Sequence, residues 1–312
     1  MPDRKIIKIG YLKITDHLIL GITLDKLKNN QESFNHCELE AIQFSSWNNI
    51  ADALAEGEID GAFMLAPTAM DLYKSGVQIK LILFTHKGGS VIIKNRSAGI
   101  KNLHDFKGKV VLIPYQLSIQ NVLFHRLLSS VDLKPGTSND PDVDVFLEVM
   151  APSMMPEALQ FDEEGEIGGF IVAEPFGSQS VEMGIGEEFC LSGDLWKKHP
   201  CCVFVIKDDI ISNHHDAVVE VTQSFVKSGN FIEENYETAS SIGEFFLNQP
   251  ESVMKKILDP SANRICTSEL YPVISDLEAI QDYMFDDMKI IDSKIDISGF
   301  VDTKFADLAG AK

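Results

Sequence analysis

The sequence predicts an α/β protein of two domains, each built on a doubly wound and mainly parallel sheet. Three observations support this prediction. The chain has 312 residues, more than one hydrophobic core usually serves. Short apolar runs alternate with segments of helical spacing, first over residues 5–74 and again over residues 109–178. The loops that follow the strands of each half converge at one sheet edge, where α/β sheets bind small ligands.

In the first half, each expected strand leads into a polar loop and then a helix. Strands are expected at 5–12, 38–44 and 59–65. The loops after them are 15–17, 45–47 and 66–68. Thr15-Asp16-His17 is expected to cap the helix that follows it, and Ser46 or Ser45 to cap the next one. Backbone N–H groups at such helix starts suit an anion or a polar ligand group.

The second half repeats this order after a glycine-containing connection. Strands are expected at 77–84, 90–94, 109–113, 143–149 and 167–173, and a return strand at 201–207. Gly88 and Gly89 separate the first two of these strands, and they predict a hinge. The loops that converge here are 114–118, 150–153 and 174–178.

The stretch 167–181, IGGFIVAEPFGSQSV, is the centre of the prediction. Its apolar run ends abruptly at Glu174-Pro175, and a proline cannot donate to a sheet ladder, so the strand leaves its sheet there. At this edge, Glu174 can accept hydrogen bonds from a ligand or bridge to the facing domain. The alternative is a strand followed by an exposed turn, with Glu174 in solvent.

The remainder of the chain is expected to be helical. Apolar residues have helical spacing at 213–234, 238–246, 250–257 and 270–284. Disorder is expected after Ala306.

Composition excludes several function classes. The net charge of −20 opposes binding to nucleic acid or anionic lipid, because both need a basic face. No apolar run approaches the ~18 residues of a membrane span. The N-terminus shows no apolar signal-peptide region, so the protein is expected to be cytoplasmic, or periplasmic or at the cell surface if a leader is missing from this sequence.

The cysteines indicate neither disulfides nor a metal site. They are odd in number and irregularly spaced, and no Cys/His pairing has zinc-ligand spacing. Cys201 and Cys202 are adjacent in a strand, so their side chains are expected on opposite faces, where they are poor disulfide partners for each other. All five cysteines are expected to be buried free thiols. No GxSxG, HExxH, P-loop or GxGxxG motif is present. The sequence therefore predicts no catalytic residue, no metal and no cofactor.

Five segments resemble the solute-binding proteins of ABC importers for nitrate, bicarbonate, taurine and aliphatic sulfonates. They are GYLKITDHL (10–18), ALAEGEIDGAFMLAPT (53–68), LHDFKGKVVLIPYQLSIQNVLFHRLL (103–128), IGGFIVAEPFGSQSV (167–181) and HPCCVFVIKDDII (199–211). The resemblance implies a type II periplasmic-binding-protein fold. It implies a first lobe from residues 1–88, a second from 89–198, and a return strand with C-terminal helices on lobe one from 199–312.

The resemblance also implies a monomer that closes on a small-molecule ligand and delivers it to an ABC permease. The ligand-binding candidates it implies are Thr15, Asp16, His17, Ser46, Trp47, Thr68, Gln116, Ser118, Gln120 and Glu174.

Two departures leave the ligand open. Gln120 stands where nitrate and bicarbonate binders have a histidine-like position, and the loops contain no arginine for a bidentate grip on a sulfonate. A pyrimidine or another nitrogen heterocycle, held by neutral hydrogen bonds, by stacking on Trp47 and by the carboxylates of Asp16 or Glu174, is at least as plausible as an oxyanion.

The alternative function is a cytoplasmic enzyme or ligand sensor on the same fold. Fungal thiamine-pyrimidine synthases are similar to this chain and have a cysteine-rich run near Cys201-Cys202, but only two cysteines occur here. Menaquinone-pathway enzymes share the fold without the Glu174-Pro175 pattern.

Overall fold

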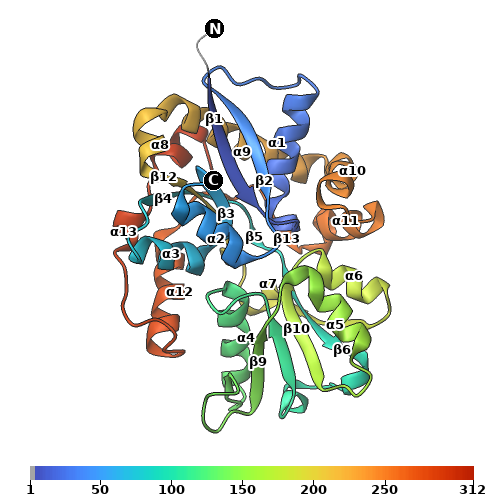
Figure 1. The fold of residues 1–312 in the computed structure, drawn as a ribbon. Helices are drawn as coiled ribbons and strands as arrows, with labels where there is room; N and C mark the ends of the chain where they lie inside the picture. The colour runs from blue at the N-terminus through green and yellow to red at the C-terminus, as the bar shows by residue number, and fades with distance from the viewer. Residues whose placement is uncertain (1–3) are drawn as a thin grey trace.

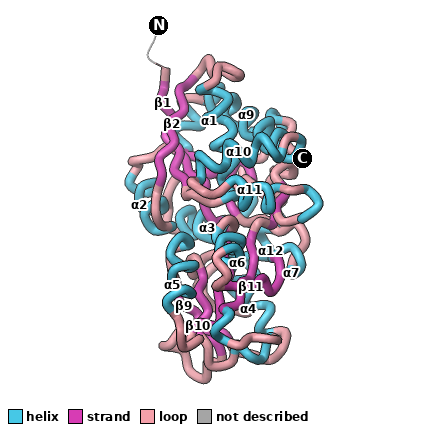
Figure 2. Tube along the Cα trace, turned by 90° about the vertical axis from the view of Figure 1, so that its right-hand side faces the viewer, coloured by secondary structure: helices cyan, strands magenta, loops and turns pink. Residues whose placement is uncertain are grey.

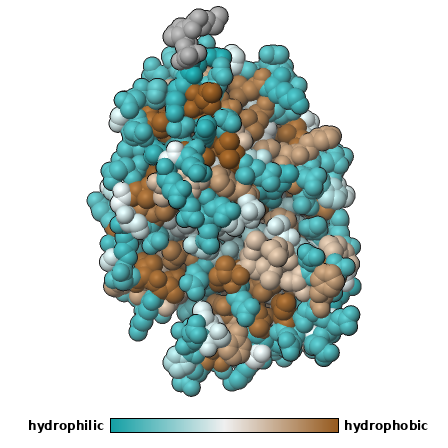
Figure 3. Space-filling model, viewed as in Figure 1, coloured by the Kyte–Doolittle hydropathy of each residue, from teal (hydrophilic) through white to brown (hydrophobic). Residues whose placement is uncertain are grey.

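The chain folds into two lobes, one above the other, each with its own sheet (Figures 1 and 2). The computed structural model describes residues 4–312. Among these residues, no helix is both long and apolar enough to cross a membrane. On the face in Figure 3, hydrophilic side chains cover most of the surface, with hydrophobic residues in separate groups between them.

Lobe one has a five-stranded sheet in the order β2-β1-β3-β12-β4. Its strands are β1 (Lys5–Tyr11), β2 (Cys37–Gln43), β3 (Gly61–Leu65), β4 (Ile79–Phe84) and β12 (Cys202–Lys207). β1 pairs in parallel with β2 and β3, and the returning β12 is antiparallel to β3 and β4.

Lobe two has a six-stranded sheet in the order β11-β6-β10-β7-β9-β8. Its strands are β6 (Ser90–Asn95), β7 (Val110–Ile113), β8 (Pro135–Gly136), β9 (Val145–Val149), β10 (Ile167–Ala173) and β11 (Gly186–Leu191). The pairs β10-β7, β7-β9 and β8-β9 are parallel, whereas β6 is antiparallel to β10 and β11. β11 is a strand that the sequence analysis did not expect.

The helices cover both faces of each sheet. In lobe one they are α1 (Leu18–Lys28), α2 (Trp47–Glu56) and α3 (Ala66–Lys74), and in lobe two α4 (Ile119–Ser129), α5 (Met155–Phe161), α6 (Phe176–Glu182) and α7 (Ser192–Leu195). Alternate residues of lobe-one strands face opposite sides, as strand geometry requires. Phe63 and Phe204 belong to the core against α1, whereas Met64 and Val203 belong to a second core that continues into lobe two.

The C-terminal helices pack mainly on lobe one. They are α8 (Asp208–Asn213), α9 (His215–Glu234), α10 (Tyr236–Leu247), α11 (Glu251–Leu258), α12 (Ile274–Asp286), α13 (Ile297–Phe300) and α14 (Lys304–Ala309). The expectation of disorder after Ala306 is wrong. α14 packs on α9, Phe305 is fully buried, and the Tyr271 N–H donates to the Lys312 carbonyl at 2.8 Å.

Two crossing segments join the lobes. The first runs from β4 through β5 (Lys87–Gly88) into β6, and the second runs from α7 into β12. β5 pairs with β13 (Ile265–Cys266), which ties the first crossing to the C-terminal part of the chain. The lobe boundaries at 88/89 and 198/199 stay predictions, and both lie within these crossings.

Candidate ligand site between the lobes

The loop after β1 contains three of the predicted site residues. Thr15, Asp16 and His17 form a single 3₁₀ turn before α1, and each is at most 1% exposed. No side chain of this turn caps α1, so the expected capping role is wrong. All three side chains are buried instead.

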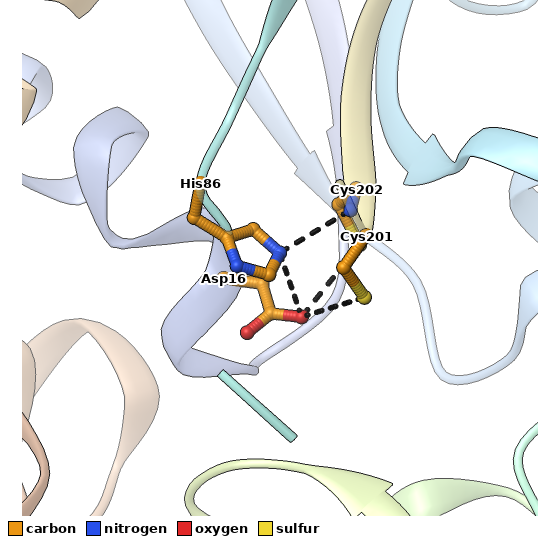
Figure 4. Close-up of side chains that lie close together, drawn as sticks. All are labelled: Asp16, His86, Cys201 and Cys202. Carbon is orange, nitrogen blue, oxygen red and sulfur yellow. Dashed lines mark hydrogen bonds and ion pairs between the residues drawn. The ribbon is translucent and has the colours of Figure 1, made fainter. Parts of the chain in front are cut away.

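Asp16 is the centre of a cluster with His86, Cys201 and Cys202 (Figure 4). Its Oδ2 lies 3.0 Å from His86 Nε2 and 3.7 Å from the Sγ atom of each cysteine. The expectation that Cys201 and Cys202 point to opposite faces is therefore wrong. Cys201 precedes β12, whose first residue is Cys202, so strict strand alternation does not apply to the pair.

The buried side chains of the cluster shift one another's pKa values. Burial alone lowers the pKa of His86, but the Asp16 carboxylate outweighs it and raises that pKa to about 10. Burial raises the pKa of Cys202 well above its usual value, and the neighbouring Cys201 adds to this. Burial also opposes ionisation of Cys201, but hydrogen bonds with Cys202 and His86 lower its pKa overall.

Gln120 connects lobe two to this cluster. Its Nε2 donates to Ser90 Oγ at 3.0 Å and to Cys201 Sγ at 3.3 Å, and its Oε1 is buried without a protein partner. The amide thus lies at the predicted site, beside a sulfur atom that the sequence analysis did not assign to it.

Buried polar atoms without a protein partner gather in this region. Among the described residues 4–312, they include Thr15 Oγ1, Asp16 Oδ1, His17 Nε2, Trp47 Nε1, Thr85 Oγ1, His86 Nδ1 and Gln120 Oε1. Each such atom costs about 1–3 kcal/mol if nothing satisfies it. Those of His17 and Trp47 belong to side chains that pack inside lobe one, whereas those of Asp16, His86 and Gln120 belong to residues where the two lobes meet. Unpartnered buried atoms where two lobes meet are typical of a site whose bound molecule completes the hydrogen bonds.

Glu174 bridges the lobes. It is 1% exposed, so the alternative of a solvent-exposed carboxylate is wrong. Its carboxylate accepts hydrogen bonds from the Ser178 N–H and hydroxyl and from the Arg264 guanidinium at 2.9 Å. Its backbone carbonyl accepts from the Thr15 N–H at 2.8 Å. Burial raises the pKa of Glu174, although Ser178 and Arg264 act in the opposite direction.

The structure brings one arginine, Arg264, to Glu174, whereas the sequence analysis considered only the loops that follow the strands. Arg264 precedes β13, far from the loops that follow the strands, and it also pairs with Glu188 of β11. Both pairings engage its guanidinium with protein carboxylates. Arg264 is therefore a contact between the lobes rather than a free grip for a sulfonate.

Three other candidates have structural partners. Ser46 caps α2, where its Oγ accepts from the Asn49 N–H at 3.3 Å. Ser118 caps α4 and donates to the Tyr115 carbonyl. The Thr68 hydroxyl donates to the Leu117 carbonyl across the lobes at 2.8 Å.

Trp47 and His17 pack against each other inside lobe one. Their rings are nearly perpendicular, with centroids 5.9 Å apart, and Trp47 is 3% exposed. Burial, with a smaller contribution from the charge of His86, lowers the pKa of His17 to about 3. His17 is therefore a neutral side chain near neutral pH.

Gln116 is not brought to the buried site. It is exposed, and it lines a cavity of about 650 Å³ beside α4 that also contacts residues 132–137 and 287–290. Gln116 is the one predicted site residue in the lining of that cavity.

The sequence analysis missed four residues that the structure brings to the site: His86, Cys201, Cys202 and Arg264. The first three lie in the two crossing segments, where the sequence analysis predicted the hinge and the return strand. A search of the crossings for ionisable side chains finds these three, whereas Arg264 has no local signal.

Several known proteins are similar to this chain. A nitrate/nitrite binding protein NrtA from Nostoc sp. is 26% identical over 237 residues, which cover 71% of this chain and 52% of that protein. The chain spans about half or less of the length of the curated relatives it matches.

Two solved structures share the arrangement of both lobes. The ligand-binding component of an ABC-type import system from Staphylococcus aureus, solved with zinc bound, has a TM-score of 0.85 and 28% identity and covers 98% of this chain and 99% of its own. The periplasmic nitrate-binding protein NrtA from Synechocystis has a TM-score of 0.85 at 17% identity, covering 99% and 89%, and supports the fold alone.

Together, the two lobes, their crossings and these structures define a solute-binding-protein fold, which confirms the predicted fold class. The NMT1-like family model matches residues 1–246, and the chain belongs to that family.

Proposed function

We propose that this protein is a non-catalytic solute receptor that closes its lobes on a small polar molecule and delivers it to an ABC permease. Its place of action is then the periplasm or the cell surface, and the receptor acts as a monomer. The relatives described above are binding proteins and an import component, which favours a receptor over the enzyme or sensor alternative.

The observation that supports this function best is the group of unpartnered buried polar atoms. Thr15 and Asp16 contribute from the loop after β1, and Gln120 contributes from α4 of the facing lobe. Buried donors and acceptors that come from two lobes suit a molecule that both lobes must surround. The contact of Glu174 with Arg264 holds the lobes together around it.

Two of the unpartnered buried atoms need a bound molecule that has hydrogen-bond donors. Asp16 Oδ1 and Gln120 Oε1 are acceptors, whereas Arg264 is already paired with Glu174 and Glu188. These two acceptors suit the N–H groups of a nitrogen heterocycle or of an amine-bearing solute such as taurine, and the unpartnered Thr15 and Thr85 hydroxyls can donate to an acceptor of the same molecule.

The test is thermal unfolding of the purified chain with and without candidate solutes: nitrate, bicarbonate, taurine, alkyl sulfonates and aminopyrimidines. A ligand at about a hundred times its Kd adds ~2.7 kcal/mol, which raises Tm by a few degrees. We expect one solute class to raise Tm and to be recovered chemically unchanged. Conversion of that solute into a product, or no shift with any of them, contradicts a receptor for these solutes.

Two glutamines provide a matched pair of variants. Gln120→Ala removes the buried amide, and Gln116→Ala removes an exposed one a few residues earlier. We expect Gln120→Ala to abolish the Tm shift and Gln116→Ala to keep it. Equal effects of both changes contradict the placement of the ligand at the buried site.

A further inference from the structure

We propose that Asp16, His86, Cys201 and Cys202 form a metal site for one zinc-like divalent transition ion, located where the two crossing segments meet lobe one. The inference deepens the proposed function, on which it rests in part because Asp16 belongs to both sites. It identifies a metal ion as one of the species held between the lobes.

The geometry matches a four-coordinate site. Each of the four residues offers one ligand atom, and these atoms all lie within 4.8 Å of one another. Asp16 Oδ2 is 3.0 Å from the His86 nitrogen and 3.7 Å from both sulfurs. Zinc bonds of about 2.0–2.3 Å in a tetrahedron place neighbouring ligand atoms about 3.3–3.8 Å apart. The three distances from Asp16 Oδ2 are within a few tenths of an ångström of these values, and the other three are at most 4.8 Å, so forming the site requires them to shorten by up to about 1 Å.

The chemistry of the ligands selects the ion. Two sulfurs and an imidazole favour zinc and related borderline or soft ions, whereas calcium and magnesium prefer oxygen ligands alone. All four side chains are at most 1% exposed. A buried set of these types is closed to solvent, as structural zinc sites are.

The surroundings hold the ligand residues in place. A Cβ atom at Gly89 would lie 2.9 Å from Asp16 Oδ1 and 3.0 Å from His86 Nδ1, and the φ of +85° also favours glycine. Gln120 donates to Cys201 Sγ at 3.3 Å from the facing lobe. Such an outer hydrogen bond to a ligand atom is typical of metal sites.

At this position a bound ion would connect both crossing segments to lobe one. His86 lies in the crossing between β4 and β6, and Cys201 lies in the crossing that enters β12. Asp16 lies in the loop after β1. An ion bound to all three joins both crossings to lobe one, next to the Thr15 N–H contact with Glu174 of lobe two.

The first experiment needs no variant. The reduced full-length chain is stripped with a chelator, dialysed, and titrated with Co²⁺ and then Zn²⁺ under anaerobic conditions. We expect one Co²⁺ per chain, a thiolate-to-cobalt charge-transfer band, the visible bands of tetrahedral cobalt, and the loss of all of them when Zn²⁺ is added. Absence of the charge-transfer band in this wild-type protein overturns the proposal.

Variants then assign the ligands. We expect Cys201→Ser, Cys202→Ser and Asp16→Asn each to weaken Zn²⁺ binding by more than about a hundredfold, and Gln120→Leu to weaken it about 10–100-fold. Cys37→Ser, which changes another buried cysteine in lobe one, is the matched control and should bind Zn²⁺ normally. Undiminished binding by Cys201→Ser and Cys202→Ser overturns the assignment, and far-UV circular dichroism verifies that each variant is folded.

The two proposals fail separately. The solute panel is run on chelator-stripped protein and on Zn²⁺-loaded protein. A solute that raises Tm in a chain without any Zn²⁺ binding overturns the metal site and leaves the receptor function intact. Zn²⁺ binding without a Tm shift for any solute supports the metal site and contradicts the receptor function for these solutes.

Discussion

The carboxylate of Glu174 and the guanidinium of Arg264 form an ion pair of 2.9 Å that joins the end of β10 in lobe two to the segment before β13. Both side chains are less than a tenth exposed. The same two residues hold the first crossing, because the Glu174 N–H donates to the Gly89 carbonyl and the Gly89 N–H donates to the Arg264 carbonyl. Glu174 and Arg264 therefore link the two lobes through their side chains and through their backbone.

Glu174→Gln is expected to lower the free energy of unfolding by about 3 kcal/mol or less, because it leaves a buried arginine with one carboxylate partner instead of two. It should also favour an open arrangement, seen as a larger radius of gyration in small-angle X-ray scattering. The control is Glu188→Gln, which removes the more exposed partner of Arg264 and should cost about 0.2–1 kcal/mol. Equal losses in the two variants would contradict the role given to Glu174.

Thr68→Val tests the second polar contact between the lobes. It removes the hydroxyl that donates to the Leu117 carbonyl and keeps the shape of the side chain. We expect a loss of about 0.5–1.5 kcal/mol in urea unfolding and weaker solute binding. Thr68→Ser keeps the donor and should retain affinity, so a loss of affinity in the serine variant as well counts against the hydrogen bond.

Ser46→Ala separates a helix cap from a ligand contact. Because Ser46 Oγ accepts from the Asn49 N–H at the start of α2, the variant should lose about 1 kcal/mol of stability. Its solute affinity should match that of the wild type, and Ser46→Asn should restore stability. A large drop in affinity with unchanged stability would return Ser46 to the ligand site.

The buried neutral His17 predicts sensitivity to acid in the metal-free protein. Its pKa is lowered to about 3, so below pH 6.5 the unfolded chain takes up a proton that the folded chain does not. This contribution to stability is present above pH 6.5 and is lost as the pH falls toward 3, at up to about 1.4 kcal/mol per pH unit. Urea unfolding across this range should show a shallower pH slope for His17→Gln than for the wild type. The exposed His104→Gln should leave the slope unchanged, and an identical slope in all three proteins contradicts the prediction.

Phe305→Ala tests the order of the C-terminus. Phe305 is fully buried where α14 packs on α9 and β4, so its truncation should cost about 3–5 kcal/mol. Leu308→Ala changes a half-exposed residue of the same helix and should cost under about 1 kcal/mol. Similar stabilities of the two variants would contradict the packing of α14 on α9 and β4.

Local pattern was enough to predict most of the strands and the edge where the site lies. The run 167–173 was predicted with the bounds that β10 has, because an apolar run bounded by acidic residues and a proline has few other conformations. β11 was missed, since GEEFCL is half-exposed and has no clear alternation. α14 was missed because its short sequence is ordered by packing on α9 rather than by helix propensity.

The sequence by itself determined the two α/β halves and the loops that converge at the sheet edges, including Glu174 at the end of its strand, because these follow from periodicity and chain order. The candidates Asp16 and Gln120 came from the resemblance to solute-binding proteins. Only the tertiary structure decided their partners. His86 and Cys201 are 115 positions apart, and Arg264 lies 90 positions beyond Glu174, so no spacing rule links them. The crossings bring His86 and Cys201 together beside the loop that holds Asp16, whereas Arg264 reaches Glu174 from the segment before β13.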